Sequence, residues 1–137
     1  MRTIAYDIGT KRVGVAVSDP LGTIASPAGV VLRSEDAAAD AARLAEMATE
    51  YEAERIVVGM PVSLRGEREI AAHKIEEFIA LLRERTALPI VEWDERMTTA
   101  IAERTMIGAD VSRMERRRKI DQVAAALILQ SYLDSLP

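Results

Sequence analysis

The most constraining feature of the sequence is the stretch 3–19, TIAYDIGTKRVGVAVSD, which predicts two strands joined by a tight turn. Branched and small residues alternate through 13–18, and a period of two is typical of a strand with two different faces. Gly9 lies in the turn, where its access to positive φ suits a short connection. Asp7 ends the first strand beside the small face of the second, which leaves room for an ion and a phosphate backbone. The alternative is that Asp7 only accepts hydrogen bonds from the turn.

The composition narrows the kinds of chemistry open to the chain. Its 137 residues predict one domain, 1–137, that is long enough to bury a core without covalent staples. Cysteine is absent, which excludes disulfides and thiolate metal sites, and the single histidine, His73, argues against a Ser-His-Asp triad. We expect His73 to lie on the surface. Any catalysis therefore has to depend mainly on carboxylates.

Charge and hydropathy indicate where such a protein would act. No apolar run suits a signal peptide or a membrane span, so we expect a soluble cytoplasmic protein that does not bind membranes. The net charge of −4 argues against a generally basic nucleic-acid coat. It still allows a local basic patch, and patches rather than totals guide phosphate binding.

Apolar patterns along the rest of the chain alternate between strand and helix. After the opening hairpin the sequence predicts a strand over 23–32, broken at Pro27, and a helix capped by Ser34 that runs to about Tyr51 with an alanine-rich face. The later elements are a strand over 55–60, a helix over 67–85, a strand over 88–93, a helix over 98–108, and a last helix capped by Ser112 that ends near 133. This order predicts an α/β fold with a mixed five-stranded sheet and helices on both faces.

Acidic residues stand where the predicted fold could bring them together. Asp94 and Glu95 follow the last strand, and Asp121 lies on the final helix. The residues three, four and seven positions after Asp121 are apolar, so this carboxylate shares a sheet-facing stripe. Burying a lone carboxylate is costly unless a cation or strong donors offset it. The alternative is a surface pair with Arg117 or Arg118.

Carboxylates from separate elements that meet at one sheet edge form an oxygen-rich site suited to Mg²⁺ or Mn²⁺. Two such ions about 3.5–4 Å apart can activate a water and stabilise the leaving oxygen in phosphodiester hydrolysis. Lys11, Arg12 and the basic run 113–119 would hold phosphates beside that site. The alternative for the run is a solvated helix face. Five basic residues in seven, within an acidic protein and just before Asp121, favour the phosphate interpretation.

Four blocks of sequence, in this order along the chain, resemble the signature of the YqgF/RuvX family. They are 7–19 (DIGTKRVGVAVSD), 57–61 (VVGMP), 94–99 (DERMTT) and 120–133 (IDQVAAALILQSYL). The resemblance covers essentially the whole chain. It implies a ribonuclease H-like fold related to the Holliday junction resolvase RuvC, and a nuclease that processes the 5′ end of the small-subunit ribosomal RNA precursor. The alternative that it implies is a resolvase acting on branched DNA.

Matching positions to the family also implies roles for single residues. Asp7, Glu95 and Asp121 would form a catalytic, metal-binding triad for Mg²⁺ or Mn²⁺, with Asp94 as the substitute for Glu95. We expect structured RNA or branched DNA as partner, and either a monomer or a homodimer, because a resolvase needs two active sites. The residues expected to hold the nucleic acid are Lys11, Arg12, Arg96, Arg116, Arg117, Arg118 and Lys119.

Two other protein classes share parts of this pattern. Asp-x-Gly-Thr also begins the phosphate loop of actin-like ATPases, but those enzymes grip a nucleotide between two such domains, and this chain has residues for one. A non-catalytic nucleic-acid-binding module of the same fold is the second alternative. Acids at all three triad positions speak against it.

Overall fold

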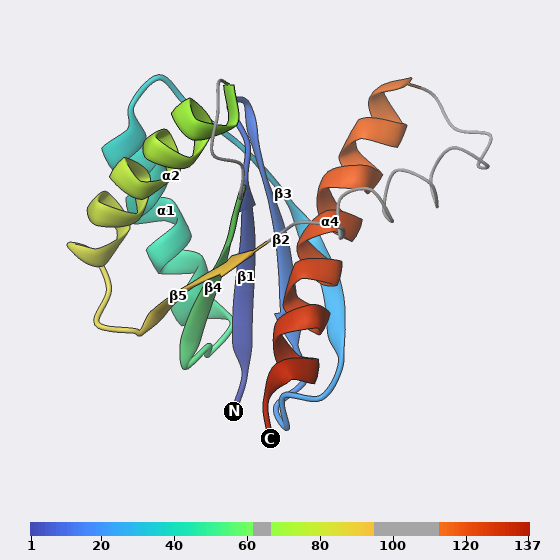
Figure 1. Cartoon of the computed structure of the whole chain (residues 1–137). Helices are drawn as coiled ribbons and strands as arrows, with labels where there is room; N and C mark the ends of the chain where they lie inside the picture. The colour runs from blue at the N-terminus through green and yellow to red at the C-terminus, as the bar shows by residue number, and fades with distance from the viewer. Residues whose placement is uncertain (62–66, 95–112) are drawn as a thin grey trace.

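The core of the protein is a five-stranded sheet in the order β3-β2-β1-β4-β5, seen in a computed structural model that describes residues 1–61, 67–94 and 113–137 (Figure 1). The strands are β1 (Thr3–Ile8), β2 (Arg12–Ser18), β3 (Ala25–Leu32), β4 (Arg55–Met60) and β5 (Ile90–Asp94). Antiparallel pairing joins β1 to β2 and β2 to β3, whereas β1–β4 and β4–β5 are parallel. The predicted mixed five-stranded sheet is confirmed.

Helices pack on both faces of this sheet, as predicted. The helices α1 (Ala37–Glu50) and α2 (Glu67–Arg83) lie on one side, and α4 (Arg113–Ser135) lies on the other (Figure 1). One apolar core joins β1, β2 and β4 to α1 and α2 through large side chains such as Tyr6, Leu44 and Ile79. A second core joins the same strands to α4 through smaller sheet residues such as Ala16. Because α4 meets small side chains, its backbone can approach the sheet closely.

The alternation along β1 and β2 decides which residues meet which helix. Val13 and Val15 belong to the core under α1 and α2, whereas Ala16 belongs to the core under α4. By the same period of two, Asp7 and Gly14 face α4. The predicted two-faced strand is therefore confirmed. Its small face, however, is not left open for a ligand along its length, since α4 packs on it.

Two local predictions are wrong. Gly9 does not have positive φ. It is needed for a close approach instead, because its N–H donates to the Arg12 carbonyl at 2.8 Å and a Cβ would lie 2.8 Å from that oxygen. The N-cap of α1 is Asp36, which accepts from two amides of the first turn, and not Ser34, which donates to Asp40. A carboxylate placed one residue before the helix accepts both amides at once, so it displaces the serine from that role.

The described boundaries lie within two residues of the predicted ones, and β4 spans 55–60 as predicted. The predicted helix over 98–108 and the cap Ser112 lie outside the described residues. Within the described ranges, no helix is both long enough and apolar enough to cross a lipid bilayer.

Candidate active site

Asp7 and Asp121 come together across Gly14, although they belong to β1 and α4. Asp7 is the direct cross-strand partner of Gly14 in the antiparallel β1–β2 pair. Directly opposed positions of such a pair share a face, with Cβ positions about 4.5–5.5 Å apart. On this face, the backbone carbonyl of Asp121 occupies the space that a Cβ of Gly14 would need. The glycine thus lets α4 bring Asp121 to the end of β1 that carries Asp7.

Asp121 is held by an arginine from the sheet. Arg12 Nε donates to Asp121 Oδ2 at 2.8 Å, and the two side chains are 29% and 27% exposed. The next turn of α4 is apolar, since Ala124 and Ala125 are buried. A carboxylate on such an apolar stripe requires a strong donor, and the charged guanidinium of Arg12 supplies one. The side chains of Arg117 and Arg118, the alternative partners expected from helical spacing, lie outside the described part of the chain.

Arg12 and Lys11, both expected to hold phosphates, leave β2 and the turn at this site. A guanidinium carries five N–H donors, so an arginine that uses Nε for Asp121 can direct others to a phosphate oxygen. Lys11 is exposed at the turn between β1 and β2. Arg12 therefore lies next to Asp121, and Lys11 precedes it in the turn after Asp7.

The turn that connects Asp7 to Arg12 is fixed from the α1 side by Arg33. The backbone N–H of Arg33 donates to the Lys11 carbonyl at 2.8 Å, and Arg33 Nη1 donates to the Gly9 carbonyl at 3.0 Å. The guanidinium also lies over the Phe78 ring, 4.9 Å from the ring centroid. This arginine holds the turn in place, and nothing in the hairpin sequence alone indicated it.

Asp40 on α1 completes this support. Its side chain is buried, accepts from the Ser34 N–H and hydroxyl at 3.0 and 2.8 Å, and lies 3.5 Å from Arg33 Nε. Burial raises the pKa of Asp40, but the hydrogen bonds from Ser34 and the nearby Arg33 together hold this pKa below its ordinary value. The sequence pattern of this helix predicts only an alanine-rich face. The available signal was an aspartate four residues before Leu44, on the buried stripe of the helix.

Replacing Asp40 with asparagine is expected to lower the free energy of unfolding by about 1–3 kcal/mol at pH 7, because Ser34 and Arg33 lose an ionised acceptor. Since the folded pKa is depressed, this contribution is present above the unfolded pKa of about 4. It is lost as pH falls through the folded value. Urea unfolding at pH 7 and pH 3 should therefore show a difference from wild type that shrinks in acid. Glu46→Gln, an exposed change on the same helix, should show no difference at either pH, and an Asp40 effect independent of pH would contradict this account.

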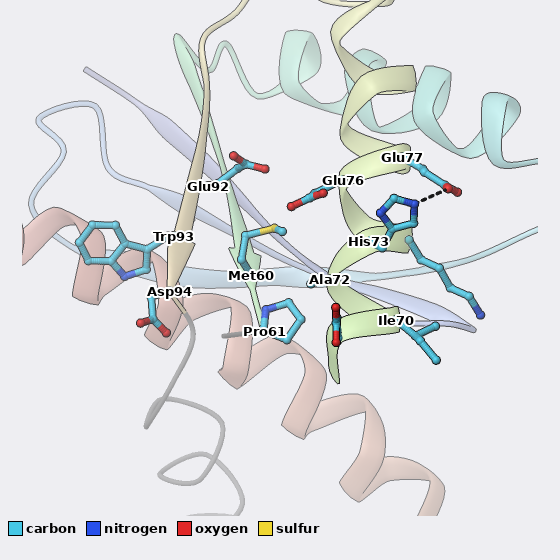
Figure 2. A pocket seen from close by; sticks show the side chains of 12 residues that line it. Met60, Pro61, Ile70, Ala72, His73, Glu76, Glu77, Glu92, Trp93 and Asp94 are labelled. Carbon is cyan, nitrogen blue, oxygen red and sulfur yellow. Dashed lines mark ion pairs between the residues drawn. The ribbon is translucent and has the colours of Figure 1, made fainter. Parts of the chain in front are cut away.

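Asp94 is the last residue of β5, and the residues before it alternate between the two sides of that strand. The residue before it, Trp93, faces α4, where its Nε1 donates to Ser131 Oγ at 3.2 Å and its ring meets Tyr132 edge to face. Glu92 extends to the opposite side of the strand (Figure 2). Asp94 lies at the end of the strand, below Trp93 in Figure 2, and lines a groove between β5 and α2. Glu95 and Arg96 lie outside the described residues, as do the side chains of 116–119.

Two of the acids expected to bind metal lie in the described part of the chain and near each other. Asp7 and Asp121 offer carboxylate oxygens, the hard ligands that Mg²⁺ and Mn²⁺ bind. Within the described ranges, no three acidic, histidine or cysteine side chains lie close enough to hold a metal ion. His73 is exposed, as predicted, and lies 3.3 Å from Glu77. The carboxylates of Asp7 and Asp121 thus suit a divalent hard cation. The third expected acid, Glu95, lies outside the described residues.

Comparison with protein families gives matches along nearly the whole chain. A family model described as "RuvX: Holliday junction resolvase" matches residues 1–135. A protein of Desulforamulus reducens is 47% identical over 135 residues, which is 98% of both chains. One of Geobacillus kaustophilus is 48% identical over 136 residues, 98% of this chain and 99% of the relative. Both bear the name "Putative pre-16S rRNA nuclease".

Solved structures with little sequence identity share the fold. RuvC of T. thermophilus, in complex with a Holliday junction substrate, superposes with a TM-score of 0.59 at 19% identity, covering 97% of this chain and 96% of RuvC. The Holliday junction resolvase of fowlpox virus also gives a TM-score of 0.59, at 17% identity, with 99% and 100% of the two chains covered. The arrangement of sheet and helices is therefore the ribonuclease H-like one that RuvC has.

Proposed function

The chain belongs to the RuvX family, and from this membership and the meeting of Asp7 with Asp121 we propose that it is a metal-dependent nuclease that hydrolyses phosphodiester bonds. The substrate that we propose is the 5′ end of the small-subunit ribosomal RNA precursor, in line with the name of the relatives. The whole chain, 1–137, would act as one ribonuclease H-like domain.

The observation that carries this proposal is the close approach of α4 to Gly14, which brings an acid from each end of the chain to one place. We propose that Asp7, Asp121 and Glu95 hold Mg²⁺ or Mn²⁺. Glu95 is preferred to Asp94 because it is the acid within the Asp-Glu-Arg block that resembles the family signature. When bound, such ions activate a water and stabilise the leaving oxygen of the phosphodiester.

The residues of the chain itself would position the acids and the substrate. Arg12 holds Asp121 in place through its Nε, and its other N–H groups are suited to a non-bridging phosphate oxygen. Arg33 and Asp40 keep the turn after Asp7 from shifting. Together these contacts would preorganise the carboxylates before a substrate arrives, which is the condition for efficient electrostatic stabilisation.

Basic residues would supply most of the affinity for nucleic acid. We propose that the basic part of α4, which directly precedes Asp121, lies along the phosphate backbone on one side of the acids, and that the turn lies on the other. The residues concerned are Lys11, Arg12, Arg96, Arg116, Arg117, Arg118 and Lys119. Phosphate contacts from the turn and from α4 would together centre a scissile phosphate near the acids.

A resolvase acting on branched DNA is the second candidate, supported by the shared fold with RuvC and by the description of the family model. Such an enzyme cuts two strands and so needs two active sites, hence a dimer. A monomeric molar mass in solution would count against this candidate.

Cleavage of a matched panel tests the proposal. The panel holds an end-labelled RNA with the 5′ leader of the small-subunit precursor and a four-way DNA junction, each with Mg²⁺, with Mn²⁺ and with chelator. We expect metal-dependent cutting of the RNA and an intact junction. Cutting of the junction alone would favour the resolvase, and binding without any cutting would favour the non-catalytic module.

A further inference from the structure

A groove of about 960 Å³ lies between α2 and β5, on the sheet face opposite α4 (Figure 2). Its apolar lining comes from the ends of β4 and β5 and from the exposed side of α2, where Ile70 is 59% exposed. The apolar side chains are those of Met60, Pro61, Ile70 and Ala72; Trp93 borders the groove from β5, while its ring packs against α4. Of the acids expected to bind metal, Asp94 lines this groove, whereas Asp7 and Asp121 do not. The groove therefore adjoins the candidate active site at the end of β5.

The rim of the groove is strongly acidic. Its carboxylates are Glu69, Glu76, Glu77, Glu92 and Asp94, all on exposed residues. The basic residues among the lining are Lys74 and His73, and His73 is already paired with Glu77 (Figure 2). Such a surplus of negative charge repels a polyanion and attracts a cation. The groove is therefore unsuited to RNA or DNA and suited to a basic ligand.

The strand beside the groove is an edge of the sheet. Ile56 N–H donates to the Pro89 carbonyl at 2.9 Å, which fixes the parallel ladder between β4 and β5. In that ladder Val91 and Trp93 direct their backbone groups toward β4, so Ile90 and Glu92 direct theirs outward. No strand in the described part of the chain pairs with that side. Outward N–H and C=O groups are what an added strand needs.

The opposite edge of the sheet, β3, is built differently. It contains Pro27, Gly29 with φ of 140° and a register shift against β2 at Val15 and Ala16. Proline and bulges on an edge prevent pairing with another chain. The segment 90–94 has no proline, glycine or register shift. The chain therefore protects one edge against strand addition and leaves the edge beside the acidic groove regular.

We propose that the groove binds an extended basic segment of a protein partner, which adds to β5 as a further strand. Alternate side chains of that segment would point to the α2 side, where arginine or lysine meets the carboxylates of Glu76 and Glu92. The apolar lining takes the aliphatic stems of those side chains. The acidic rim and the outward backbone groups of β5 together favour a peptide, because a small polycation has no backbone that could pair with an edge strand. The proposal does not depend on the nuclease activity.

Two measurements on the full chain test this inference. The probe is a short fluorescent peptide in which arginine and valine alternate, with a glutamate–valine peptide as its control. Fluorescence anisotropy should show saturable binding of the basic peptide only, weakened about tenfold or more by Glu76→Lys with Glu92→Lys. Glu46→Lys with Glu54→Lys changes the net charge equally at exposed sites on α1 and before β4, and should leave the Kd within about twofold. Hydrogen exchange at the Glu92 amide should slow when the peptide binds.

Several outcomes would overturn the inference. They are an absence of saturable binding, an equal loss of affinity in both double variants, and peptide binding without protection of the Glu92 amide. Protection of that amide by single-stranded RNA instead of the peptide would mark the groove as a nucleic-acid surface. RNA cleavage by Glu76→Lys with Glu92→Lys should match wild type. The failure of this proposal and the failure of the nuclease assignment are therefore distinguishable.

Discussion

Replacing Asp7 with asparagine is expected to reduce phosphodiester cleavage by about a thousandfold, which corresponds to ~4 kcal/mol of lost transition-state stabilisation. Asp7 lies on the α4 face at the end of β1, opposite Gly14 and next to the segment that carries Asp121. An amide has nearly the size of the carboxylate but lacks its charge, so it is a poor ligand for a divalent cation. The measurement is the single-turnover rate on the precursor RNA with saturating Mg²⁺ or Mn²⁺.

The same experiment needs evidence that only the chemistry has changed. Thermal unfolding and RNA affinity of Asp7→Asn should stay close to wild type, because the substitution keeps the volume of the side chain. Asp134→Asn, an exposed change at the far end of α4, should leave the rate unchanged. Cutting by Asp7→Asn at the wild-type rate would show that the acid belongs to the turn and not to a metal site.

Replacing Gly14 with alanine is expected to destabilise the protein by about 2–4 kcal/mol and to abolish cleavage in the fraction that stays folded. A Cβ at this position overlaps the backbone carbonyl of Asp121, and a backbone group cannot turn aside as a side chain can. The strand and α4 must therefore separate, which loosens the packing of Ala16 against the helix. It also moves Asp121 away from Asp7. Urea unfolding and the single-turnover rate measure the two effects.

A matched methyl addition elsewhere in the sheet provides the comparison. Ser26→Thr adds one methyl at an exposed position of the neighbouring strand β3 and should change stability by less than about 0.5 kcal/mol. If Gly14→Ala proved equally mild, α4 would not press on β2 as closely as the structure indicates. Loss of stability with full activity would separate the packing role of Gly14 from its role in placing Asp121.

Much of the architecture was predictable because it repeats at short range. The alternation in 13–18 predicted which residues of β2 share a face, and the continuous apolar run predicted β4 residue by residue. The apolar stripe after Asp121 on α4 is likewise buried as predicted. The N-cap of α1 was harder to predict, because Ser34 and Asp36 can both cap a helix and lie two residues apart. Periodicity predicts faces well and boundaries poorly.

The partners of the site residues were not predictable in the same way. Helical spacing offered Arg117 and Arg118 to Asp121, but the described partner is Arg12, 109 residues away in the sequence. The support of the turn by Arg33 and Asp40 was missed for a related reason. Asp40 was read as part of an alanine-rich helix face, while its partners lie on the segment between β3 and α1. Contacts between distant segments depend on how the layers pack, and no local period encodes that.

By itself, the amino-acid order determined the family, the described strands and helices, and which of their faces are buried. Only the tertiary structure decided that α4 would fill the small face of β2, that Arg12 would meet Asp121, and that an acidic groove would lie beside the regular edge of β5. The physical reason is range. Backbone propensity and hydrophobic period act over a few residues, whereas the placement of a charge beside another depends on close packing across the whole sheet.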